Sequence, residues 1–290
     1  MRAVLLMLLV VLTAGAIFGL GDYALRTNAW PVWQLRMLVA NARGIRTDSF
    51  GRLQRYPGKI EIACPAQDET TAVLLVAGQS NAANSQGQRY ESPDDRVVNF
   101  SEGHCYRAAS PLLGADDQRG ESWTLLGLKL IRTGLYNRVI LVPAAAGGSA
   151  ISRWAAGGDL NGMLMTAIRA AKARYAITAV LWDQGATDFT LHTPEERYRS
   201  DLKSLIDQIR AEGVTAPFFI TRCSVGGDDW TEDNAVARAQ AALADGETIL
   251  DGPNTDRDVP RSDRYDGYHF AARGQETWTD TWVQLLRAHR

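Results

Sequence analysis

The sequence predicts an α/β fold, in the form of a three-layer α/β/α sandwich around a central, mostly parallel sheet. Three observations lead to this prediction. After residue 70, short β-branched runs alternate with amphipathic helical patterns, which is the element order of parallel α/β proteins. The runs are apolar at consecutive positions, as in strands that are covered on both faces. A chain of 290 residues is also long enough to bury the core of such a domain.

The individual elements follow from these patterns in chain order. Six runs share a β-branched, apolar composition and are predicted as strands: residues 72–78, 96–100, 137–143, 177–183, 216–222 and 247–252. Five segments share a helical spacing of apolar residues and are predicted as helices: residues 122–134, 161–175, 194–213, 234–246 and about 271–288. The third helix has the clearest boundaries, since Thr193 and Pro194 suit its first turn and Gly213 suits its end.

The chain begins with an apolar segment. Residues 3–21 carry no charge and follow Arg2, and as a helix they would span roughly 28 Å, about the hydrocarbon thickness of a bilayer. A signal peptide cleaved near residues 14–16 and an uncleaved signal anchor both fit this segment. Either one predicts export, to the periplasm with anchoring in the inner membrane, or into the medium after cleavage. A buried core helix is the remaining interpretation, and it is the least favoured because the run is N-terminal and apolar on every side.

We expect three parts along the chain. Residues 1–21 are the signal peptide or anchor. Residues 22–69 have a mixed composition with arginine-rich pieces, which is typical of a linker with an N-terminal extension. The regular alternation starts only after Thr70, so residues 70–290 are expected to form the main domain.

Charge and cysteine content exclude several classes of protein. There are 31 basic and 33 acidic residues, so nothing in the charge balance favours a nucleic acid as partner. Three cysteines without a CxxC motif exclude a zinc ribbon and a disulfide-dense miniprotein. An oxidising compartment would allow Cys64 and Cys105 to form a disulfide, although three cysteines leave three pairings open. Cys223 follows an apolar strand and is expected to be a small buried residue.

Two motifs at opposite ends of the main domain together suggest a catalytic triad. Residues 78–81 (GQSN) follow the first strand, so that Ser80 would lie at a strand-to-helix turn at the carboxyl edge of the sheet. Residues 266–269 (DGYH) precede the last helix, where Asp266 could orient the imidazole of His269. Nucleophile, orienting carboxylate and general base would then be Ser80, Asp266 and His269. Each motif alone also fits a capping serine or a solvated loop pair.

Two further strand ends carry candidate donors to an oxyanion. Residues 146–149 (AGGS) follow the third predicted long strand, where a glycine N–H could donate. Residues 182–188 (WDQGATD) follow the next strand, where the side-chain amide of Gln184 could be a further donor. Taken singly, the first also fits a glycine turn and the second a capped loop.

In this order, the four motifs resemble those of the SGNH (GDSL-like) hydrolases, specifically the sialate O-acetylesterase-like carbohydrate esterases. The resemblance covers roughly residues 70 to 290. It implies an SGNH/flavodoxin-like sandwich, with Ser80 as nucleophile, His269 as base and Asp266 as its orienting group. The implied oxyanion donors are the N–H groups of Ser80 and Gly148, with Gly147 as second choice, and the side chain of Gln184.

The resemblance also implies a surface that binds the sugar. The residues expected to contact it lie next to the motifs: Gln79, Asn81, Gly147, Arg153, Trp154 and Asp188. For Arg153 and Trp154 a purely structural stacked pair is the alternative. One position departs from the family pattern, because Ala186 replaces the glutamate of QGExD. That substitution removes a polar group from the expected pocket.

The implied activity is that of an exported serine esterase. It would hydrolyse O-acetyl esters of a carbohydrate through an acyl-enzyme, with neither a metal ion nor an organic cofactor. The expected partners are the acetylated carbohydrate and, if the N-terminal segment is retained, a membrane; an SGNH domain needs no second subunit to complete its site. Two alternatives remain open: a periplasmic polysaccharide O-acetyltransferase with the same triad, and a non-catalytic glycan-binding protein.

Overall fold

The computed structural model describes residues 39–40 and 42–290, and the chain divides into two compact units, residues 1–46 and 47–290. The predicted signal peptide or anchor, residues 1–21, lies outside the described residues. Within the described part, no helix has both the length and the hydropathy that a membrane crossing requires. The larger unit begins at Thr47, so the domain boundary expected at residue 70 lies inside it.

An eight-stranded sheet forms the centre of the larger unit, with the strand order β10-β9-β8-β4-β7-β5-β6-β3. The strands are β3 (Glu61–Ile62), β4 (Thr71–Gly78), β5 (Val97–Ser101), β6 (His104–Arg107), β7 (Arg138–Ala145), β8 (Ala179–Asp183), β9 (Phe218–Arg222) and β10 (Ile249–Asn254). All pairs from β10 to β5 are parallel, whereas β6 and β3 add antiparallel pairs at one edge. Two short strands, β1 (Arg46–Thr47) and β2 (Leu53–Arg55), make a separate small sheet.

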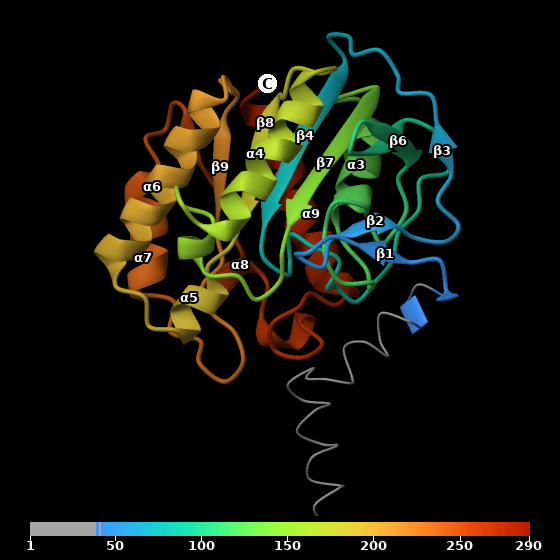
Figure 1. The fold of residues 1–290 in the computed structure, drawn as a ribbon. Coiled ribbons are helices and arrows are strands. Elements are labelled where there is room, and N and C mark those ends of the chain that lie inside the picture. The colour runs from blue at the N-terminus through green and yellow to red at the C-terminus, as the bar shows by residue number, and fades with distance from the viewer. Residues whose placement is uncertain (1–38, 41) are drawn as a thin grey trace, which may run out of the picture. The chain divides into compact units, whose positions relative to one another are not determined.

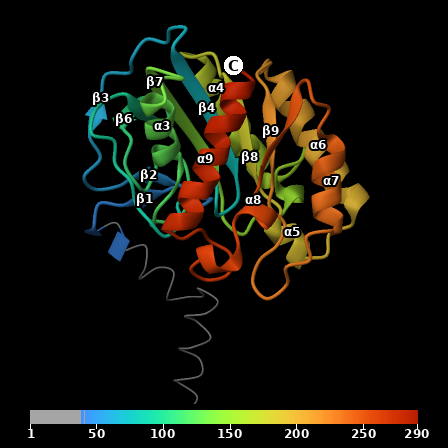
Figure 2. The ribbon, with the colours of Figure 1, turned by 180° about the vertical axis from the view of Figure 1, so that it is seen from behind.

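Helices cover both faces of this sheet (Figures 1 and 2). They are α3 (Trp123–Arg132), α4 (Asp159–Lys172), α5 (Ala186–Thr190), α6 (Glu195–Ala211), α7 (Ala235–Leu243), α8 (Thr255–Asp258) and α9 (Ala272–Ala288), with 3-10 turns η1 (Ile151–Arg153) and η2 (Arg261–Asp263). Figure 1 shows α4, α6 and α7 on the near face, and Figure 2 shows α3 and α9 on the other. The six predicted strands and five predicted helices are confirmed, within a few residues at each end.

Alternate residues of β4 explain why the strand is apolar at every position. Val73, Leu75 and Ala77 belong to the core beneath α4, α6 and α7. Ala72, Leu74 and Val76 belong to the core beneath α3 and α9. A strand with a helix layer on each face has no position for a polar side chain. The two cores and the sheet between them confirm the predicted three-layer sandwich.

Three tryptophans fix the last helix to the sheet. Trp123 of α3 lies 4.7 Å from Trp278 and 6.4 Å from Trp282 of α9, measured between ring centroids. All three side chains are buried, and buried aromatic side chains contribute large apolar areas together with favourable tilted ring contacts. This packing matters for the site, because the segment that carries His269 ends where α9 begins.

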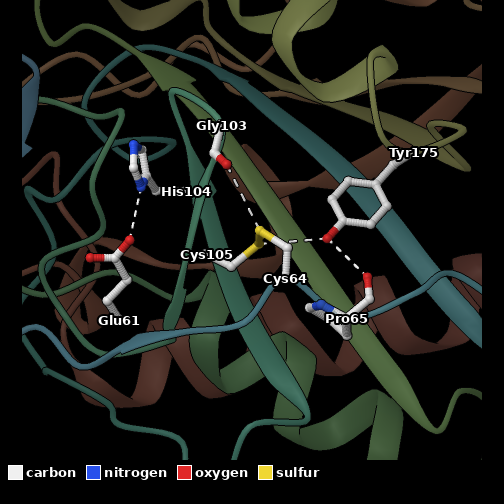
Figure 3. The surroundings of a disulfide bond; sticks show 7 residues. All are labelled: Glu61, Cys64, Pro65, Gly103, His104, Cys105 and Tyr175. Atoms are coloured by element: carbon white, nitrogen blue, oxygen red, sulfur yellow. Dashed lines mark hydrogen bonds and ion pairs between the residues drawn. A yellow bond between two sulfur atoms is a disulfide. The ribbon is translucent and has the colours of Figure 1, made fainter.

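Figure 3 shows the disulfide that joins Cys64 and Cys105. Cys105 lies in β6, and Cys64 follows β3, the neighbouring edge strand. The hydroxyl of Tyr175 lies 3.5 Å from Cys105 Sγ and donates to the Pro65 carbonyl oxygen at 3.1 Å. The bond therefore attaches the segment before β4 to the antiparallel edge of the sheet. Cys223 is buried and free.

Candidate active site

Ser80 follows β4 in a sharply bent segment. Gly78 has a φ of +134°, and a Cβ there would overlap the carbonyl of Asp183 at the end of β8. The Gln79 N–H donates to that same carbonyl oxygen at 2.8 Å. Only glycine allows the two strand ends to approach so closely, and this contact fixes the backbone that presents Ser80.

The segment after Ser80 differs from the expected strand-to-helix turn. It forms a series of turns, in which the Ala83 N–H donates to the Ser80 carbonyl oxygen at 3.1 Å, and it does not continue as a helix. Asn84 explains the difference, because its backbone N–H donates to the Asp116 carbonyl oxygen at 3.1 Å and its side chain donates to the Leu112 carbonyl oxygen at 3.0 Å. These contacts hold the chain against residues 112–117 and prevent regular helical hydrogen bonding.

Asp266 and His269 form the expected pair. Asp266 Oδ2 lies 2.7 Å from His269 Nδ1, and Asp266 Oδ1 accepts the backbone N–H groups of Tyr268 at 3.0 Å and His269 at 2.8 Å. Burial alone would raise the pKa of Asp266, but the hydrogen bonds from His269 and Tyr268 outweigh it and lower the pKa. The carboxylate therefore stays ionised and leaves Nε2 of His269 as the free ring nitrogen.

Asn81 connects the loops of Ser80 and His269. Its Nδ2 donates to the Tyr268 carbonyl oxygen at 3.2 Å, and its Oδ1 accepts the Phe270 N–H at 3.3 Å. Asn81 is buried, and its interaction with Phe270 is buried, whereas its interaction with Tyr268 is only partly buried. Asn81, the residue after Ser80, thus holds the backbone on both sides of His269.

The glycine turn after β7 lies against Ser80. A Cβ built on Gly147 would be 3.6 Å from Ser80 Cβ. The Gly147 N–H donates to Asp116 Oδ2 at 2.7 Å and is therefore occupied. Within the described part of the chain, the N–H groups of Gly148 and Ser80 have no acceptor. Gly148 has a φ of +61° and open space around its Cβ position, so these two N–H groups are the available oxyanion donors.

The structure does not place Gln184 as an oxyanion donor. Its Nε2 donates to the Ser149 carbonyl oxygen at 2.9 Å and to Asp188 Oδ2 at 2.5 Å, and its Oε1 accepts from the Tyr198 hydroxyl at 2.9 Å. Gln184 is fully buried, and a buried amide must satisfy its hydrogen bonds within the protein. The expectation from the sequence is corrected here, since both amide hydrogens are used inside the core.

Asp188 and Trp154 are also structural and do not face a sugar. Asp188 Oδ2 accepts the Ile151 N–H at 2.8 Å, and burial raises the pKa of Asp188. Trp154 has no exposed surface; its Nε1 donates to Ser149 Oγ at 2.9 Å, and its ring packs edge-on against Trp182. Both side chains therefore hold structure inside the domain: Asp188 binds the start of η1, and Trp154 binds Ser149 of the glycine turn.

The other expected sugar contacts have partners within the protein. Gln79 Oε1 accepts the Gly185 N–H at 3.1 Å and the Thr187 N–H at 3.3 Å, which fixes the loop after β8. Arg153 is exposed, but its guanidinium forms a two-pronged ion pair with Asp159 at 2.7 and 3.0 Å. Ala186, which replaces the family glutamate, begins α5 and is partly buried. Asn81 and Gly147 are engaged within the protein as well.

A surface pocket lies next to Tyr265, whose ring contacts that of His269. It has a volume of about 630 Å³, and its lining includes Gln88, Arg89, Gln118, Arg119 and Tyr265. The Tyr265 ring stacks against the His269 ring with centroids 5.8 Å apart. Arg119 Nη1 lies 3.1 Å from the Tyr265 hydroxyl oxygen and donates to it. Tyr265 therefore connects the pocket to His269.

Sequence reasoning missed three charged residues at the site. Asp116 accepts from Gly147, and burial raises its pKa to about 6. Asp183 is fully buried at the end of β8, where burial raises its pKa to about 7. Arg264 is buried and donates to the carbonyl oxygens of Tyr268 at 3.1 Å and Thr255 at 2.7 Å. Asp183 stands in a strand-end motif and could have been noticed, whereas Asp116 and Arg264 lie in irregular segments without a pattern.

No metal centre is formed by the residues that the structure describes. Groups of three or more histidine, cysteine, aspartate or glutamate side chains with the geometry of metal ligands do not occur among residues 39–40 and 42–290. The acidic groups of the site contact backbone N–H groups and His269 instead.

The comparison with protein families identifies the domain. Residues 70–280 match the model of a carbohydrate esterase family, the sialic acid-specific acetylesterases. The chain belongs to this family. It is accordingly a carboxylic-ester hydrolase of the SGNH type, as the four motifs in the sequence predict. No curated protein matches the sequence significantly.

Solved structures share the fold of this carbohydrate esterase. A protein from Arabidopsis thaliana is 18% identical, with a TM-score of 0.61 over 76% of this chain and 98% of that chain. NanS is 16% identical, with a TM-score of 0.52 over 76% and 98% of the two chains. A carbohydrate acetylesterase from Xanthomonas citri is 19% identical, with a TM-score of 0.52 over 75% of this chain and 56% of that chain.

Proposed function

We propose that this carbohydrate esterase is an exported serine enzyme that removes O-acetyl groups from its sugar through an acyl-enzyme on Ser80. The observation that carries the proposal is the 2.7 Å contact between Asp266 Oδ2 and His269 Nδ1, in a loop that Asn81 ties to the nucleophile. A carboxylate at Nδ1 fixes the tautomer in which Nε2 can accept a proton. A serine hydroxyl needs such a base, because it is a weak nucleophile at its own pKa.

The reaction proceeds in two balanced halves. Ser80 Oγ attacks the acetyl carbonyl carbon while His269 Nε2 takes the hydroxyl proton, and the oxyanion of the tetrahedral intermediate accepts the N–H groups of Ser80 and Gly148. The carbon–oxygen bond to the sugar then breaks, and the sugar oxygen receives the proton from His269. In the second half, water attacks the acetyl-serine with His269 as base, which releases acetate and restores Ser80.

The pocket beside Tyr265 supports a carbohydrate substrate. It offers an exposed aromatic ring together with the amides of Gln88 and Gln118 and the guanidinium groups of Arg89 and Arg119. Sugars present an apolar ring face and many hydroxyl groups, so an aromatic surface bordered by planar donors suits them. Because Tyr265 also stacks on His269, a sugar in the pocket would place its ester near the base.

Two features support export. The apolar segment of residues 3–21 has the length and the preceding positive charge of a signal peptide or anchor. The disulfide between Cys64 and Cys105 is of a kind that persists in oxidising compartments. We therefore place the esterase in the periplasm, anchored in the inner membrane, or outside the cell if the segment is cleaved.

The test is an assay of the purified protein on p-nitrophenyl acetate and on acetylated xylan or O-acetylated sialic acid. Ser80→Ala and His269→Ala should each lower turnover by at least about a thousandfold. Intact mass measured during turnover should show one added acetyl group on the wild type and none on Ser80→Ala. A well-folded wild type without turnover would contradict the proposal and favour an acetyltransferase or a glycan-binding protein.

A further inference from the structure

Asp116 lies between the nucleophile and the oxyanion turn. Its Oδ2 accepts the Gly147 N–H at 2.7 Å. A Cβ on Gly147 would lie 3.1 Å from Asp116 Oδ2 and 3.6 Å from Ser80 Cβ, so the carboxyl group and the nucleophile approach Gly147 from the same side. A carboxyl group is therefore built into the site in addition to Asp266.

The backbone of Asp116 is fixed to both loops of the site. Its N–H donates to the Ala145 carbonyl oxygen at 3.2 Å, at the end of β7, just before the glycine turn. Its carbonyl oxygen accepts the Asn84 N–H at 3.1 Å, in the turns that follow Ser80. Asp116 thus holds a constant position relative to the two segments that supply the oxyanion donors.

The second carboxyl oxygen, Oδ1, is enclosed and has no hydrogen-bond partner among the residues that the structure describes. A structural carboxylate would use both oxygens, because an unpaired buried polar atom costs about 1–3 kcal/mol. The charged groups around Asp116 do little to stabilise a negative charge on its carboxyl group. Asp48 is already paired with Arg52 at 2.7 Å, and Asp117 adjoins Asp116 and lies 4.0 Å from Arg119. Burial raises the pKa of Asp116 to about 6. The negative charges of Asp117 and Asp48 also raise this pKa, whereas the hydrogen bond from Gly147 lowers it.

We infer that Asp116 is a positioning residue of the esterase, which holds the Gly147–Gly148 turn beside Ser80 and promotes acylation in its protonated form. The inference rests on the proposed function. Holding the Gly147 N–H keeps this turn in the conformation that leaves the Gly148 N–H available to the oxyanion. A negative charge at the same place opposes the oxyanion by Coulomb repulsion. Protonation removes that charge, while the oxygen that accepts from Gly147 remains.

Two substitutions at residue 116 separate these effects, measured on the full chain with p-nitrophenyl acetate. Asp116→Ala removes the acceptor, so kcat should fall by about tenfold to a hundredfold with KM within about twofold. Asp116→Asn keeps an oxygen for Gly147 without a charge and should restore kcat to the wild-type level or above. Asp207→Asn, the same substitution on the exposed face of α6, is the control and should leave kcat unchanged.

The pH profile tests the charge directly. The ratio of kcat for Asp116→Asn to kcat for the wild type should be near one at about pH 5 and at least about threefold at about pH 8. Effects of pH on other parts of the enzyme are common to both proteins and largely cancel in this ratio. A ratio that does not change with pH would overturn the proposed effect of protonation. An Asp116→Asn variant as impaired as Asp116→Ala would overturn the positioning role.

A second measurement does not depend on turnover. The amide proton of Gly147 should change its NMR chemical shift between about pH 5 and pH 7 in the wild type and in Ser80→Ala, because its acceptor titrates there. The change should vanish in Asp116→Asn. An invariant Gly147 signal in the wild type would overturn the inference. Absence of esterase activity with a titrating Gly147 signal would instead contradict the proposed function.

Discussion

Asn81 holds His269 in place through the backbone on either side of it, with hydrogen bonds of 3.2 and 3.3 Å to residues 268 and 270. The nucleophile immediately precedes Asn81 in the chain. Asn81 therefore contributes to the position of His269 relative to Ser80. The Tyr265 hydroxyl, which donates to the Ser85 carbonyl oxygen at 2.7 Å, is a further connection between the two loops.

Removing this amide should weaken catalysis more than binding. We expect Asn81→Ala to lower kcat by at least about tenfold with little change in KM, because a small displacement of the base suffices for such a loss. The variant should also lose about 1–3 kcal/mol of stability, since the buried Phe270 N–H loses its partner, whereas the Tyr268 carbonyl oxygen keeps Arg264. Steady-state kinetics and urea unfolding measure both effects. Asn81→Asp keeps the acceptor for Phe270 and should be less impaired, and an Asn81→Ala enzyme with full kcat would contradict the role given to Asn81.

The ionised carboxylate of Asp266 should be essential even where the loop keeps its shape. In Asp266→Asn the backbone N–H groups of residues 268 and 269 retain an acceptor, but the side chain no longer stabilises a protonated imidazole. We expect kcat to fall by about a thousandfold or more, with the protein still folded. Circular dichroism serves as the folding control. Because the hydrogen bonds lower the pKa of Asp266, the carboxylate of the wild type should stay ionised at pH values below the usual titration range of a carboxyl group.

The disulfide should stabilise the domain without affecting the chemistry. Cys64 and Cys105 are separated by 41 residues, and closing a loop of that length contributes about 4 kcal/mol in the chain-entropy model. We expect the Cys64→Ser/Cys105→Ser double variant to unfold at a lower urea concentration, with kcat and KM unchanged under native conditions. Cys223→Ser leaves the disulfide intact and provides a comparison. Equal stability of the double variant and the wild type in an oxidising buffer would contradict the expectation.

Burial of Asp183 should make the stability depend on pH. Its pKa is raised to about 7 in the folded protein, so the folded state holds a proton that the unfolded chain loses between about pH 4 and pH 7. Over this window the contribution of Asp183 to stability should fall by a few kcal/mol as the pH rises, since one pKa unit corresponds to about 1.4 kcal/mol.

Asp183→Asn should remove much of this loss and unfold at a higher temperature than the wild type at about pH 8. Thermal unfolding at several pH values measures the effect. Asp207→Asn, which removes an exposed carboxylate, should follow the wild-type curve, and parallel curves for Asp183→Asn and the wild type would contradict the expected effect.

Arg119 should contribute to carbohydrate binding and not to the chemical step. We expect Arg119→Ala to raise KM for an acetylated carbohydrate by about fivefold, the equivalent of roughly 1 kcal/mol of lost binding. The same variant should hydrolyse p-nitrophenyl acetate with wild-type kinetic constants, because that substrate does not reach the pocket. Arg197→Ala, which removes an exposed arginine of α6, is the matched control. A loss that is equal for both substrates would show that Arg119 acts on the catalytic groups instead.

The sequence was sufficient to predict the sandwich, because strands covered on both faces must be apolar throughout. Val73 and Leu74 illustrate this, since they point to opposite cores and are equally buried. It was not sufficient for β3 and β6, which are short strands near one edge of the sheet and lack that pattern. The helix expected after Ser80 fails for a tertiary reason, because Asn84 bonds to a loop that no local pattern reveals.

The sequence was likewise sufficient for one part of the candidate site and not for another. Ser80, Asp266 and His269 could be named from motifs, since their chemistry depends on residue type and on chain order. Gln184 was given a donor role for the same reason, yet its burial beside Tyr198 uses both of its amide hydrogens within the core. Whether a polar side chain faces the substrate or the interior depends on packing, which a motif does not encode.

The order of these groups along the chain determines when the protein can first act. A polypeptide synthesised as far as Asn254, the end of β10, contains the nucleophile and every strand of the described sheet. It lacks His269 and the helix whose tryptophans dock against Trp123. In the proposed mechanism, ester cleavage therefore requires His269 and α9, so a polypeptide terminated at Asn254 would remain chemically inert.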